Sequence, residues 1–345
     1  MGASKIRVLI VEDSLVAIEM LRQILTSDPA IEVVGVASNG ADAIAAAQQL
    51  HPDLITMDIH MPGMDGLEAT EQIMAYNPTP ILVVSSSVYA EGMGRAFDAL
   101  TLGALDVIKK PEPRKWEDLG EIARDIISRV KILANVHVVT HIRGKRGRPA
   151  PDTIADVPPR RSMIAIASST GGPSALLDVL GRLPKELPVP VVVVQHIADG
   201  FVPGLVNWLD AACSVKCVVG GDGDVPEPGV VYFAPTGSNM VFDGRALRVV
   251  QPAEGQLYVP NADVLFESVA ANVRSGAIGV VLTGMGADGA SGLSRIKAAG
   301  GATIAQDEKS STVFGMPKVA IDLGAAEQVL PATAIAGAIE RLVVR

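Results

Sequence analysis

Two adjacent serines, Ser168 and Ser169, stand where an apolar run meets glycines in IAIASSTGGPSAL, residues 164–176. A strand, a glycine turn and a helix in this order could hold a phosphate, or could hold a serine nucleophile on a sharp turn. A dinucleotide fingerprint needs G-x-G-x-x-G, and a P-loop needs a lysine. The stretch lacks both, and Pro173 follows the glycines at once. The pattern therefore favours a nucleophile, with a nucleotide site as the alternative.

A serine nucleophile needs a general base and a carboxylate to orient that base. His196 is the single histidine of residues 162–345, and it ends the expected strand VPVVVVQH. A neutral imidazole suits proton transfer near neutral pH. Asp288 lies in the glycine-rich turn of GVVLTGMGADGASGL, where glycines also let backbone N–H groups approach a substrate carbonyl as an oxyanion hole. The order Ser, His, Asp and the missing G-x-S-x-G differ from α/β-hydrolases.

A second set of polar side chains follows expected strands nearer the N-terminus: Glu12, Asp13, Asp58, Ser85 and Lys110. Carboxyl ends of parallel strands share one rim of a sheet, so these groups should converge. Clustered carboxylates need a cation, and hard oxygen ligands suit Mg²⁺. Such an ion would help Asp58 to attack a phosphoryl group, while Lys110 and Ser85 contact the phosphoryl oxygens.

The elements that position these residues follow from the apolar pattern. Up to residue 134 we expect alternating strands and helices, with strands at 5–11, 31–37, 54–59, 81–86 and 106–110. From residue 162 the pattern restarts, with strands in MIAIAS, VPVVVVQH, VVYFAP, ALRVV, AIGVVLTG, GATIAQ and EQVL, and a hairpin-like insertion near 228–250. The predicted fold class is α/β with two doubly wound parallel-sheet domains. They should span 1–134 and 162–345, joined by a linker over 135–161 whose last 21 residues are rich in Pro and Gly.

Composition narrows the function classes. The 345 residues carry a net charge of -9, with a pI near 5.1, so we expect no nucleic-acid partner. No apolar stretch reaches transmembrane length, and the N-terminus runs directly into a strand, so we expect a cytoplasmic protein without membrane insertion. Aromatic residues make up 3% of the chain, which predicts aliphatic cores. Cys213 and Cys217 are expected to be reduced thiols with no metal or disulfide role.

The blocks VLIVEDS, DLITMDIHMPGMDGLEA, ILVVSSS and DVIKKP resemble a response-regulator receiver domain over residues 5 to about 130. The resemblance implies a flavodoxin-like fold and phosphorylation of Asp58, with Ser85 as the switch hydroxyl and Lys110 as the conserved lysine. It also implies Mg²⁺ bound by Glu12, Asp13, Asp58 and the backbone carbonyl of His60. Val107 stands where many receivers carry an aromatic switch residue.

The blocks IASSTGGPSAL, VVVVQHIADGF, VYFAP, VLTGMGADGASGL and FGMPKVA are similar to the catalytic domain of bacterial chemotaxis protein-glutamate methylesterases, a Rossmann-like domain. The resemblance spans nearly the whole chain. It implies that Ser169, not Ser168, is the nucleophile, His196 the general base and Asp288 the orienting carboxylate. The backbone around Thr170 and Met285 takes the oxyanion position.

This resemblance implies a carboxylic ester hydrolase that is activated by phosphorylation and has protein-glutamine glutaminase activity. Its substrates would be glutamate methyl esters and glutamines of methyl-accepting chemotaxis receptors, and a chemotaxis histidine kinase would be the phosphodonor. We expect a monomer, with no cofactor in the catalytic domain. The alternative is a phosphorylation-gated binding module of a chemosensory pathway that turns nothing over.

The chain departs from the family pattern at three single residues, Ala167, Trp208 and Asn239, and in the segment PNADVLF at 260–266. None of them removes the expected triad. Trp208 and the segment 260–266 are expected to line the surface that meets substrate.

Overall fold

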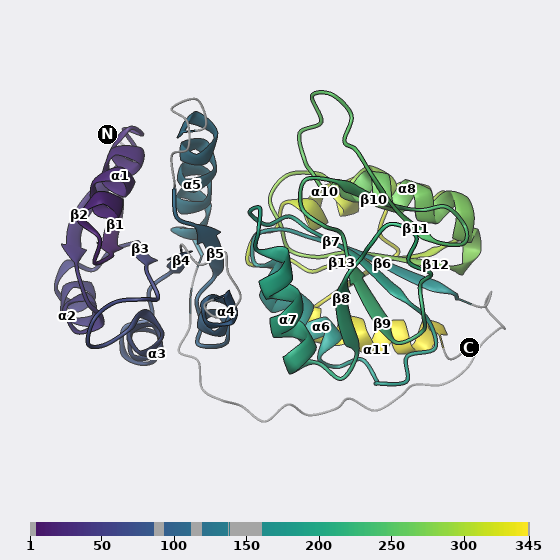
Figure 1. Cartoon of the computed structure of the whole chain (residues 1–345), viewed down its shortest axis with the longest axis horizontal. Coiled ribbons are helices and arrows are strands. Elements are labelled where there is room, and N and C mark those ends of the chain that lie inside the picture. The colour runs from purple at the N-terminus through teal and green to yellow at the C-terminus, as the bar shows by residue number, and fades with distance from the viewer. Residues whose placement is uncertain (1–4, 86–92, 112–118, 137, 139–160, 344–345) are drawn as a thin grey trace. The chain divides into compact units, whose positions relative to one another are not determined.

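The computed structural model describes residues 5–85, 93–111, 119–136, 138 and 161–343. The chain forms two compact units, Met1–Gly147 and Arg148–Arg345 (Figure 1). Almost all of the expected linker, 135–161, lies outside the described residues.

The described part of the first unit holds a five-stranded parallel sheet in the order β2-β1-β3-β4-β5. Its strands are β1 (Ile6–Val11), β2 (Ile31–Ala37), β3 (Leu54–Met57), β4 (Ile81–Ser85) and β5 (Asp106–Lys109). Its helices are α1 (Leu15–Thr26), α2 (Gly40–Leu50), α3 (Gly66–Tyr76), α4 (Met93–Thr101) and α5 (Leu119–Leu133).

Helices cover both faces of this sheet, with α1 against α5 on one face and α2, α3 and α4 on the other (Figure 1). A sheet covered on both faces needs apolar side chains pointing both ways, which explains why β3 and β4 are buried throughout. Side chains before the helices start them: Asn39 and Asp65 accept backbone N–H groups of the first turns of α2 and α3. The strand order reverses between β1 and β3, which opens a crevice at their carboxyl ends.

The described part of the second unit holds a seven-stranded parallel sheet in the order β14-β13-β12-β6-β7-β9-β8. Its strands are β6 (Met163–Ser168), β7 (Val191–Gln195), β8 (Lys216–Val219), β9 (Val230–Phe233), β12 (Ala277–Val281), β13 (Ala302–Gln306) and β14 (Gln328–Leu330). An antiparallel pair, β10 (Asn239–Phe242) and β11 (Leu247–Val250), stands apart from it. The helices are α6 (Gly172–Leu180), α7 (Val202–Ala212), α8 (Ala262–Val273), α9 (Ala290–Ala298), α10 (Met316–Asp322) and α11 (Ala332–Val343), with a 3₁₀ turn, η1 (Arg274–Gly276).

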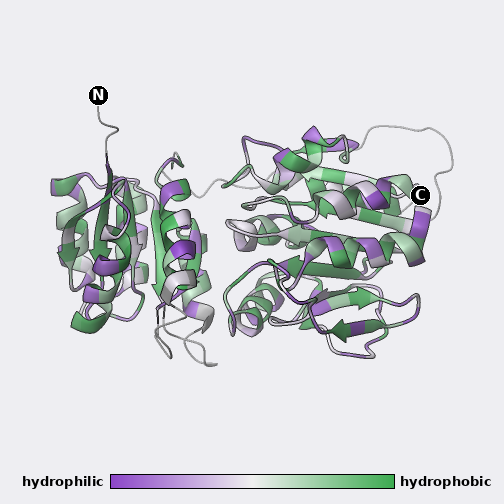
Figure 2. Cartoon of the chain, turned by 90° about the horizontal axis from the view of Figure 1, so that it is seen from above, coloured by the Kyte–Doolittle hydropathy of each residue, from purple (hydrophilic) through white to green (hydrophobic). Residues whose placement is uncertain are grey.

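Helices α6, α7 and α11 lie on one face of the second sheet, and α8, α9 and α10 lie on the other. The hydropathy colouring shows apolar strands between helices whose outer faces carry the polar residues (Figure 2). The strand β6 lies between β7 and β12. After β6 the chain first adds β7, β8 and β9 on one side of it, and later adds β12, β13 and β14 on the other side. This strand is the switch point of the sheet, where doubly wound folds place their ligand sites. The predicted α/β class with two doubly wound parallel sheets is confirmed.

The hairpin-like insertion expected near 228–250 is only partly right. The segment Val230–Phe233 pairs in parallel with β7 and β8 and belongs to the main sheet, so only β10 and β11 form a hairpin. The strands β8 and β10 were not expected, because each has only four residues and begins with a polar one. Within the described ranges, no helix is long and apolar enough to cross a membrane.

Candidate active site and acidic pocket

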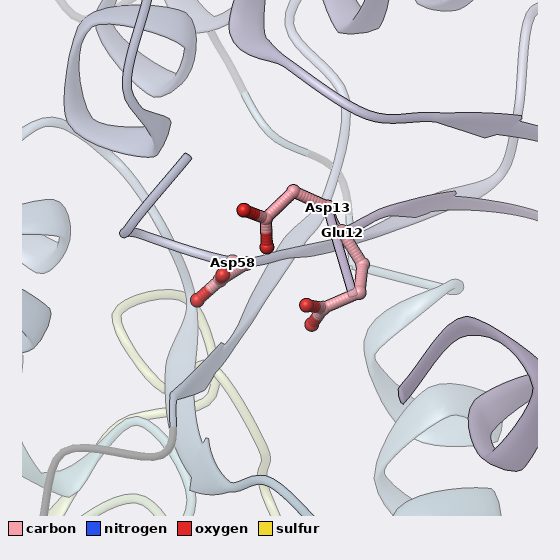
Figure 3. Close-up of side chains that lie close together, drawn as sticks. All are labelled: Glu12, Asp13 and Asp58. Carbon is pink, nitrogen blue, oxygen red and sulfur yellow. The ribbon is translucent and has the colours of Figure 1, made fainter. Parts of the chain in front are cut away.

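The acidic pocket of the first unit lies at the carboxyl ends of β1 and β3. Glu12 and Asp13 follow β1, Asp58 follows β3, and one carboxylate oxygen from each lies within 4.8 Å of the others (Figure 3). Glu12 and Asp58 are buried, at 0% and 3% exposed, whereas Asp13 is exposed. Three carboxylate oxygens, one of them open to water, fit a hard divalent cation that keeps some of its water ligands.

Lys110 supplies the positive charge of this pocket. Its Nζ lies 2.7 Å from Oε2 of Glu12 and 2.9 Å from Oδ2 of Asp58. Burial alone would lower the pKa of Lys110, but its hydrogen bonds to Glu12 and Asp58 outweigh burial and raise it above the ordinary value. Burial, together with the charge of Asp58, raises the pKa of Glu12 despite the opposing effect of Lys110. Lys110 is therefore cationic at the rim where a phosphoryl group on Asp58 would lie.

Ser85 ends β4 and is fully buried, and its carbonyl oxygen accepts the backbone N–H of Lys110 at 2.9 Å. This bond aligns the ends of β4 and β5 at the same rim as Asp58. His60, two residues after Asp58, is exposed, whereas its neighbours Ile59 and Met61 are buried. Val107 is 2% exposed in β5 and is a core residue.

The candidate active site of the second unit lies at the switch point of the larger sheet. Ser169 follows β6, His196 follows β7, and Asp288 lies in the turn between β12 and α9. Two backbone hydrogen bonds join the ends of these strands. The N–H of His196 donates to Ser168 O at 2.9 Å, and the N–H of Ser169 donates to Thr283 O at 3.0 Å.

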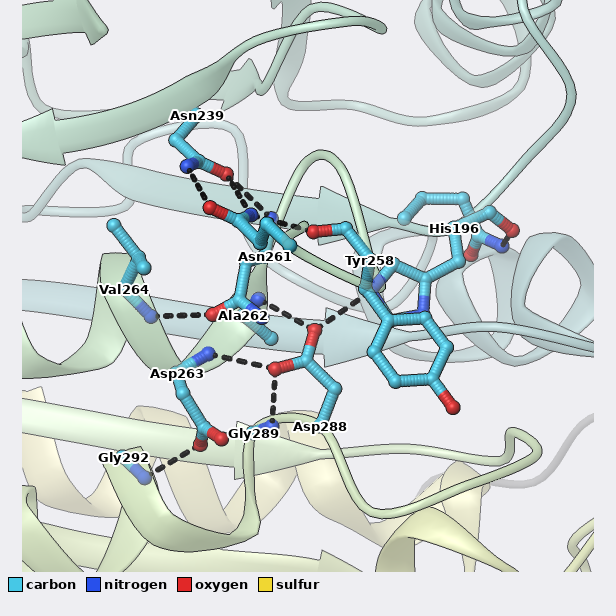
Figure 4. A network of polar contacts seen from close by, with 12 residues as sticks. His196, Asn239, Tyr258, Asn261, Ala262, Asp263, Val264, Asp288, Gly289 and Gly292 are labelled. Atoms are coloured by element: carbon cyan, nitrogen blue, oxygen red, sulfur yellow. Dashed lines mark hydrogen bonds and ion pairs between the residues drawn. The ribbon is translucent and has the colours of Figure 1, made fainter. Parts of the chain in front are cut away.

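His196 and Asp288 form a direct pair, with Nε2 of the imidazole 2.8 Å from Oδ2 of the carboxylate (Figure 4). Nδ1 of the same ring is buried and has no hydrogen-bonding partner among the described residues. An imidazole that donates its Nε2 proton to a carboxylate keeps a lone pair on Nδ1. Nδ1 is therefore the atom able to accept a proton from a nucleophile.

Asp288 is fixed by backbone donors at the starts of two helices. Its Oδ2 also accepts the N–H of Ala262 at 2.7 Å, and its Oδ1 accepts the N–H groups of Asp263 and Gly289, both at 3.0 Å. The first two belong to the first turn of α8, and Gly289 caps α9. Together these donors hold the Asp288 side chain in one orientation.

The two adjacent serines have different surroundings. Ser168 is 0% exposed, and its hydroxyl donates to Oε1 of Gln195 at 2.6 Å. Nε2 of Gln195 donates in turn to the carbonyl oxygens of Ser169 and His196, at 2.8 and 2.9 Å. Ser169 is 6% exposed, and its hydroxyl makes no hydrogen bond within the described part of the chain. Ser168 thus helps to hold the turn, and Ser169 has the available hydroxyl.

The turn after Ser169 requires its glycine. Gly171 adopts a φ of 74°, in the left-handed region that side chains with a Cβ avoid. The backbone then enters α6, with Pro173 in its first turn.

Thr170 and Met285, the expected oxyanion residues, flank the same turns. The Thr283 hydroxyl can donate to the carbonyl oxygen of Thr170, at 3.0 Å. The same hydroxyl accepts the N–H of Val313 at 2.9 Å. The N–H of Ser169 is already used by Thr283 O, so it is not an oxyanion donor. The oxyanion role of the backbone around Thr170 and Met285 stays a prediction.

Several residues at the site were missed by the sequence prediction. Gln195 was one, although its place beside His196 at the end of a buried strand could have signalled it. Tyr258 was another: its ring stacks on His196 with centroids 5.1 Å apart and planes 10° apart. A third was the amide pair of Asn239 and Gln256, which the sequence places 17 residues apart.

The expected substrate-facing role of Trp208 is wrong, because this side chain is 7% exposed and belongs to the core. The segment 260–266 starts α8 and supplies backbone donors to Asp288. Three of its residues, Asn261, Asp263 and Val264, are partly exposed, and its substrate-facing role stays a prediction.

The fold and both sites define a response regulator with an α/β output domain. Residues 8–119 match the response regulator receiver domain, and residues 164–339 match the CheB methylesterase family. The chain belongs to the CheB methylesterase family.

Bacterial relatives support this assignment over nearly the full length. The chain is 43% identical to "Protein-glutamate methylesterase/protein-glutamine glutaminase 3" of Myxococcus xanthus, over 94% of this chain and 90% of that protein. It is also 43% identical to "Protein-glutamate methylesterase/protein-glutamine glutaminase 2" of Anaeromyxobacter dehalogenans, over 99% of this chain and 98% of that protein. The solved CheB methylesterase catalytic domain of Thermotoga maritima is 36% identical, with a TM-score of 0.52, and covers 53% of this chain and 99% of that one.

Proposed function

We propose that this protein hydrolyses glutamate methyl esters, and deamidates glutamines, on methyl-accepting chemotaxis receptors. The observation that carries the proposal is the His196–Asp288 pair, whose second ring nitrogen is buried and has no hydrogen-bonding partner in the described part of the chain. The backbone of His196 is bonded to that of Ser168, next to Ser169. The relatives carry the names of these two activities. Those names favour an enzyme over the alternative of a binding module without turnover.

In the proposed reaction, the Ser169 hydroxyl attacks the side-chain carbonyl carbon and gives its proton to Nδ1 of His196. Asp288 stabilises the imidazolium through Nε2. Backbone N–H groups at Thr170 and Met285 stabilise the oxyanion. The imidazolium then protonates the leaving group, which departs as methanol from an ester or ammonia from an amide. Water hydrolyses the acyl-enzyme with His196 as base, which restores Ser169 and releases a glutamate.

In the receiver, the proposal assigns Asp58 as the phosphorylated aspartate. Glu12, Asp13, Asp58 and the carbonyl of His60 would hold Mg²⁺, which neutralises phosphoryl charge when bound. Lys110 and Ser85 would contact the phosphoryl oxygens. The assigned domains are a receiver over 1–134, a linker over 135–161 and a methylesterase domain over 162–345. A chemotaxis histidine kinase would be the phosphodonor for a cytoplasmic monomer.

The test is methanol release from membranes that carry methylated receptors. We expect release by the wild-type chain and none above background by His196→Ala, because the serine then has no base. Phosphorylation with a small-molecule phosphodonor should raise the rate of the wild type but not that of Asp58→Asn. Equal release by wild type and His196→Ala would contradict the catalytic assignment. An equal response of wild type and Asp58→Asn would contradict the regulatory one.

A further inference from the structure

Tyr258 covers one face of the His196 imidazole. The two rings are nearly parallel, with an interplanar angle of 10° and centroids 5.1 Å apart, which is an offset stack (Figure 4). Asp288 holds the edge of the same imidazole through Nε2. The ring is therefore restrained from two directions, one polar and one aromatic.

The segment that carries Tyr258 is itself held by a half-buried pair of amide side chains. Nδ2 of Asn239 donates to Oε1 of Gln256 at 2.9 Å, and Nε2 of Gln256 donates to Oδ1 of Asn239 at 3.0 Å. The same Nε2 also donates to the carbonyl oxygen of Tyr258 at 2.6 Å. Asn239 is 3% exposed and Gln256 is half-buried, so these bonds are partly shielded from water.

The amide pair also reaches the helix that fixes Asp288. Oδ1 of Asn239 accepts the N–H of Asn261 at 2.9 Å, and Asn261 caps α8. The N–H groups of the first turn of α8 bind Asp288. One connected network thus positions both groups that contact His196, Tyr258 at its face and Asp288 at its edge.

The phenol end of Tyr258 reaches the turn that bears Met285. A Cβ placed on Gly286 would lie 2.6 Å from the Tyr258 hydroxyl, and Gly286 has a φ of 89°. Only glycine leaves room for the ring at this point. Tyr258 therefore spans the distance between the imidazole and the turn of the proposed oxyanion donor.

We propose that Tyr258 is a positioning residue for the general base, an inference that rests on the proposed function. A ring held only at Nε2 can still tilt about its bond to Cβ, which moves Nδ1 relative to the Ser169 hydroxyl. The Tyr258 face blocks that tilt. A misplacement near 1 Å in a catalytic group costs up to about 100-fold in rate.

The test uses the full-length chain and methanol release from methylated receptor membranes. Tyr258→Leu should lower kcat by about 10- to 100-fold with little change in KM, because it disturbs the reacting geometry and not substrate binding. Tyr258→Phe should restore most of that loss, since it keeps the stacked face. Gln256→Ala should lower kcat in the same direction by loosening the Tyr258 segment. The matched control is Leu257→Ala, at the neighbouring and 82% exposed position, which should behave as wild type.

A second readout separates positioning from a general loss of structure. In NMR spectra, the ring current of Tyr258 should change the chemical shifts of the His196 ring protons. Tyr258→Leu should remove that change, while the remaining resonances keep the chemical shifts of the folded protein. An unchanged kcat in Tyr258→Leu, or a raised KM alone, would overturn the inference. Equal methanol release by Ser169→Ala and wild type would instead overturn the proposed function, so the two failures are distinguishable.

Discussion

Nε2 of His196 lies 2.8 Å from Oδ2 of Asp288, and the opposite ring nitrogen, Nδ1, is buried with no hydrogen-bonding partner among the described residues. An unpaired buried acceptor is costly in a folded protein and is commonly found where a group has a task in the reaction. In the proposed reaction, Nδ1 is therefore the ring nitrogen that acts as the base, and the Ser169 hydroxyl must lie on that side of the ring.

Asp288→Asn should lower methanol release by about 1,000- to 10,000-fold, the loss seen when a triad carboxylate becomes an amide. The amide also presents an NH₂ group toward backbone donors that now bind the carboxylate. The matched control is Asp263→Asn, a neighbouring carboxylate whose Oδ1 accepts the N–H of Gly292 at 2.6 Å, a role that an amide oxygen can keep. Comparable losses in both variants would contradict a specific role for Asp288.

Asp263 also predicts a pH dependence of stability. Burial raises its pKa above the ordinary value, and the charge of Asp288 adds to this, although the Gly292 N–H opposes the shift. A carboxyl group whose pKa is raised by folding favours the folded state fully below its unfolded pKa. That contribution is lost as the pH rises through the folded pKa.

Thermal unfolding at pH 4 and pH 8 would check this. We expect Asp263→Asn to lose less stability than wild type between the two values, because the amide has no proton to release. The interpretation fails if the variant loses more stability than wild type on going to pH 8.

The acidic pocket predicts Mg²⁺-dependent phosphorylation. A small-molecule phosphodonor should label the wild-type chain in the presence of Mg²⁺. Labelling should disappear with a chelator, because no divalent cation then neutralises the phosphoryl charge, and in Asp58→Asn, because the chain then lacks its acceptor. Asp53→Asn is the control, since its side chain accepts the N–H of Arg7 at the other end of the strands. Labelling that survives in Asp58→Asn would move the acceptor elsewhere.

The two thiols should be slow to react. Burial raises the pKa of Cys213 to about 11 and that of Cys217 to about 12, so both remain protonated at neutral pH. At pH 8, alkylation of Cys213 should be about 100-fold slower than in the unfolded chain, in proportion to the thiolate present. Alkylation followed by mass spectrometry, with and without denaturant, measures this ratio. Equal rates would contradict the burial of these side chains.

Much of this fold could be predicted from the sequence because parallel strands leave a strong signal. Runs such as Val191–Val194 are apolar on both faces, and the turns after them hold polar residues at the carboxyl rim. The order of those turns along the chain is enough to bring Ser169, His196 and Asp288 to one switch point. Glu12 and Asp58 could be predicted to lie together in the same way, because each follows a strand of one parallel sheet.

Contacts that depend on side-chain geometry between distant loops were not predictable. Tyr258 and His196 are separated by more than sixty residues, and the loop before α8 has no periodic pattern that would place it. The expectation for Trp208 was wrong for a different reason. It was expected to face substrate because its position departs from the family pattern, but a large apolar side chain on an amphipathic helix is buried when the helix packs on a sheet.

Ser168→Ala tests the structural half of the serine assignment. It removes the buried donor to Oε1 of Gln195, so we expect a loss of about 1–3 kcal/mol in the free energy of unfolding. Chemical denaturation measures this loss. A variant as stable as wild type would contradict the role of Ser168 in holding the turn.

Methanol release by Ser169→Ala and Ser168→Ala, compared side by side on methylated receptor membranes, tests the central claim most directly. We expect Ser169→Ala to lose at least about 1,000-fold in rate, as on removal of a triad nucleophile, while Ser168→Ala stays within about 10-fold of wild type. Full activity in Ser169→Ala, together with loss in Ser168→Ala, would contradict it.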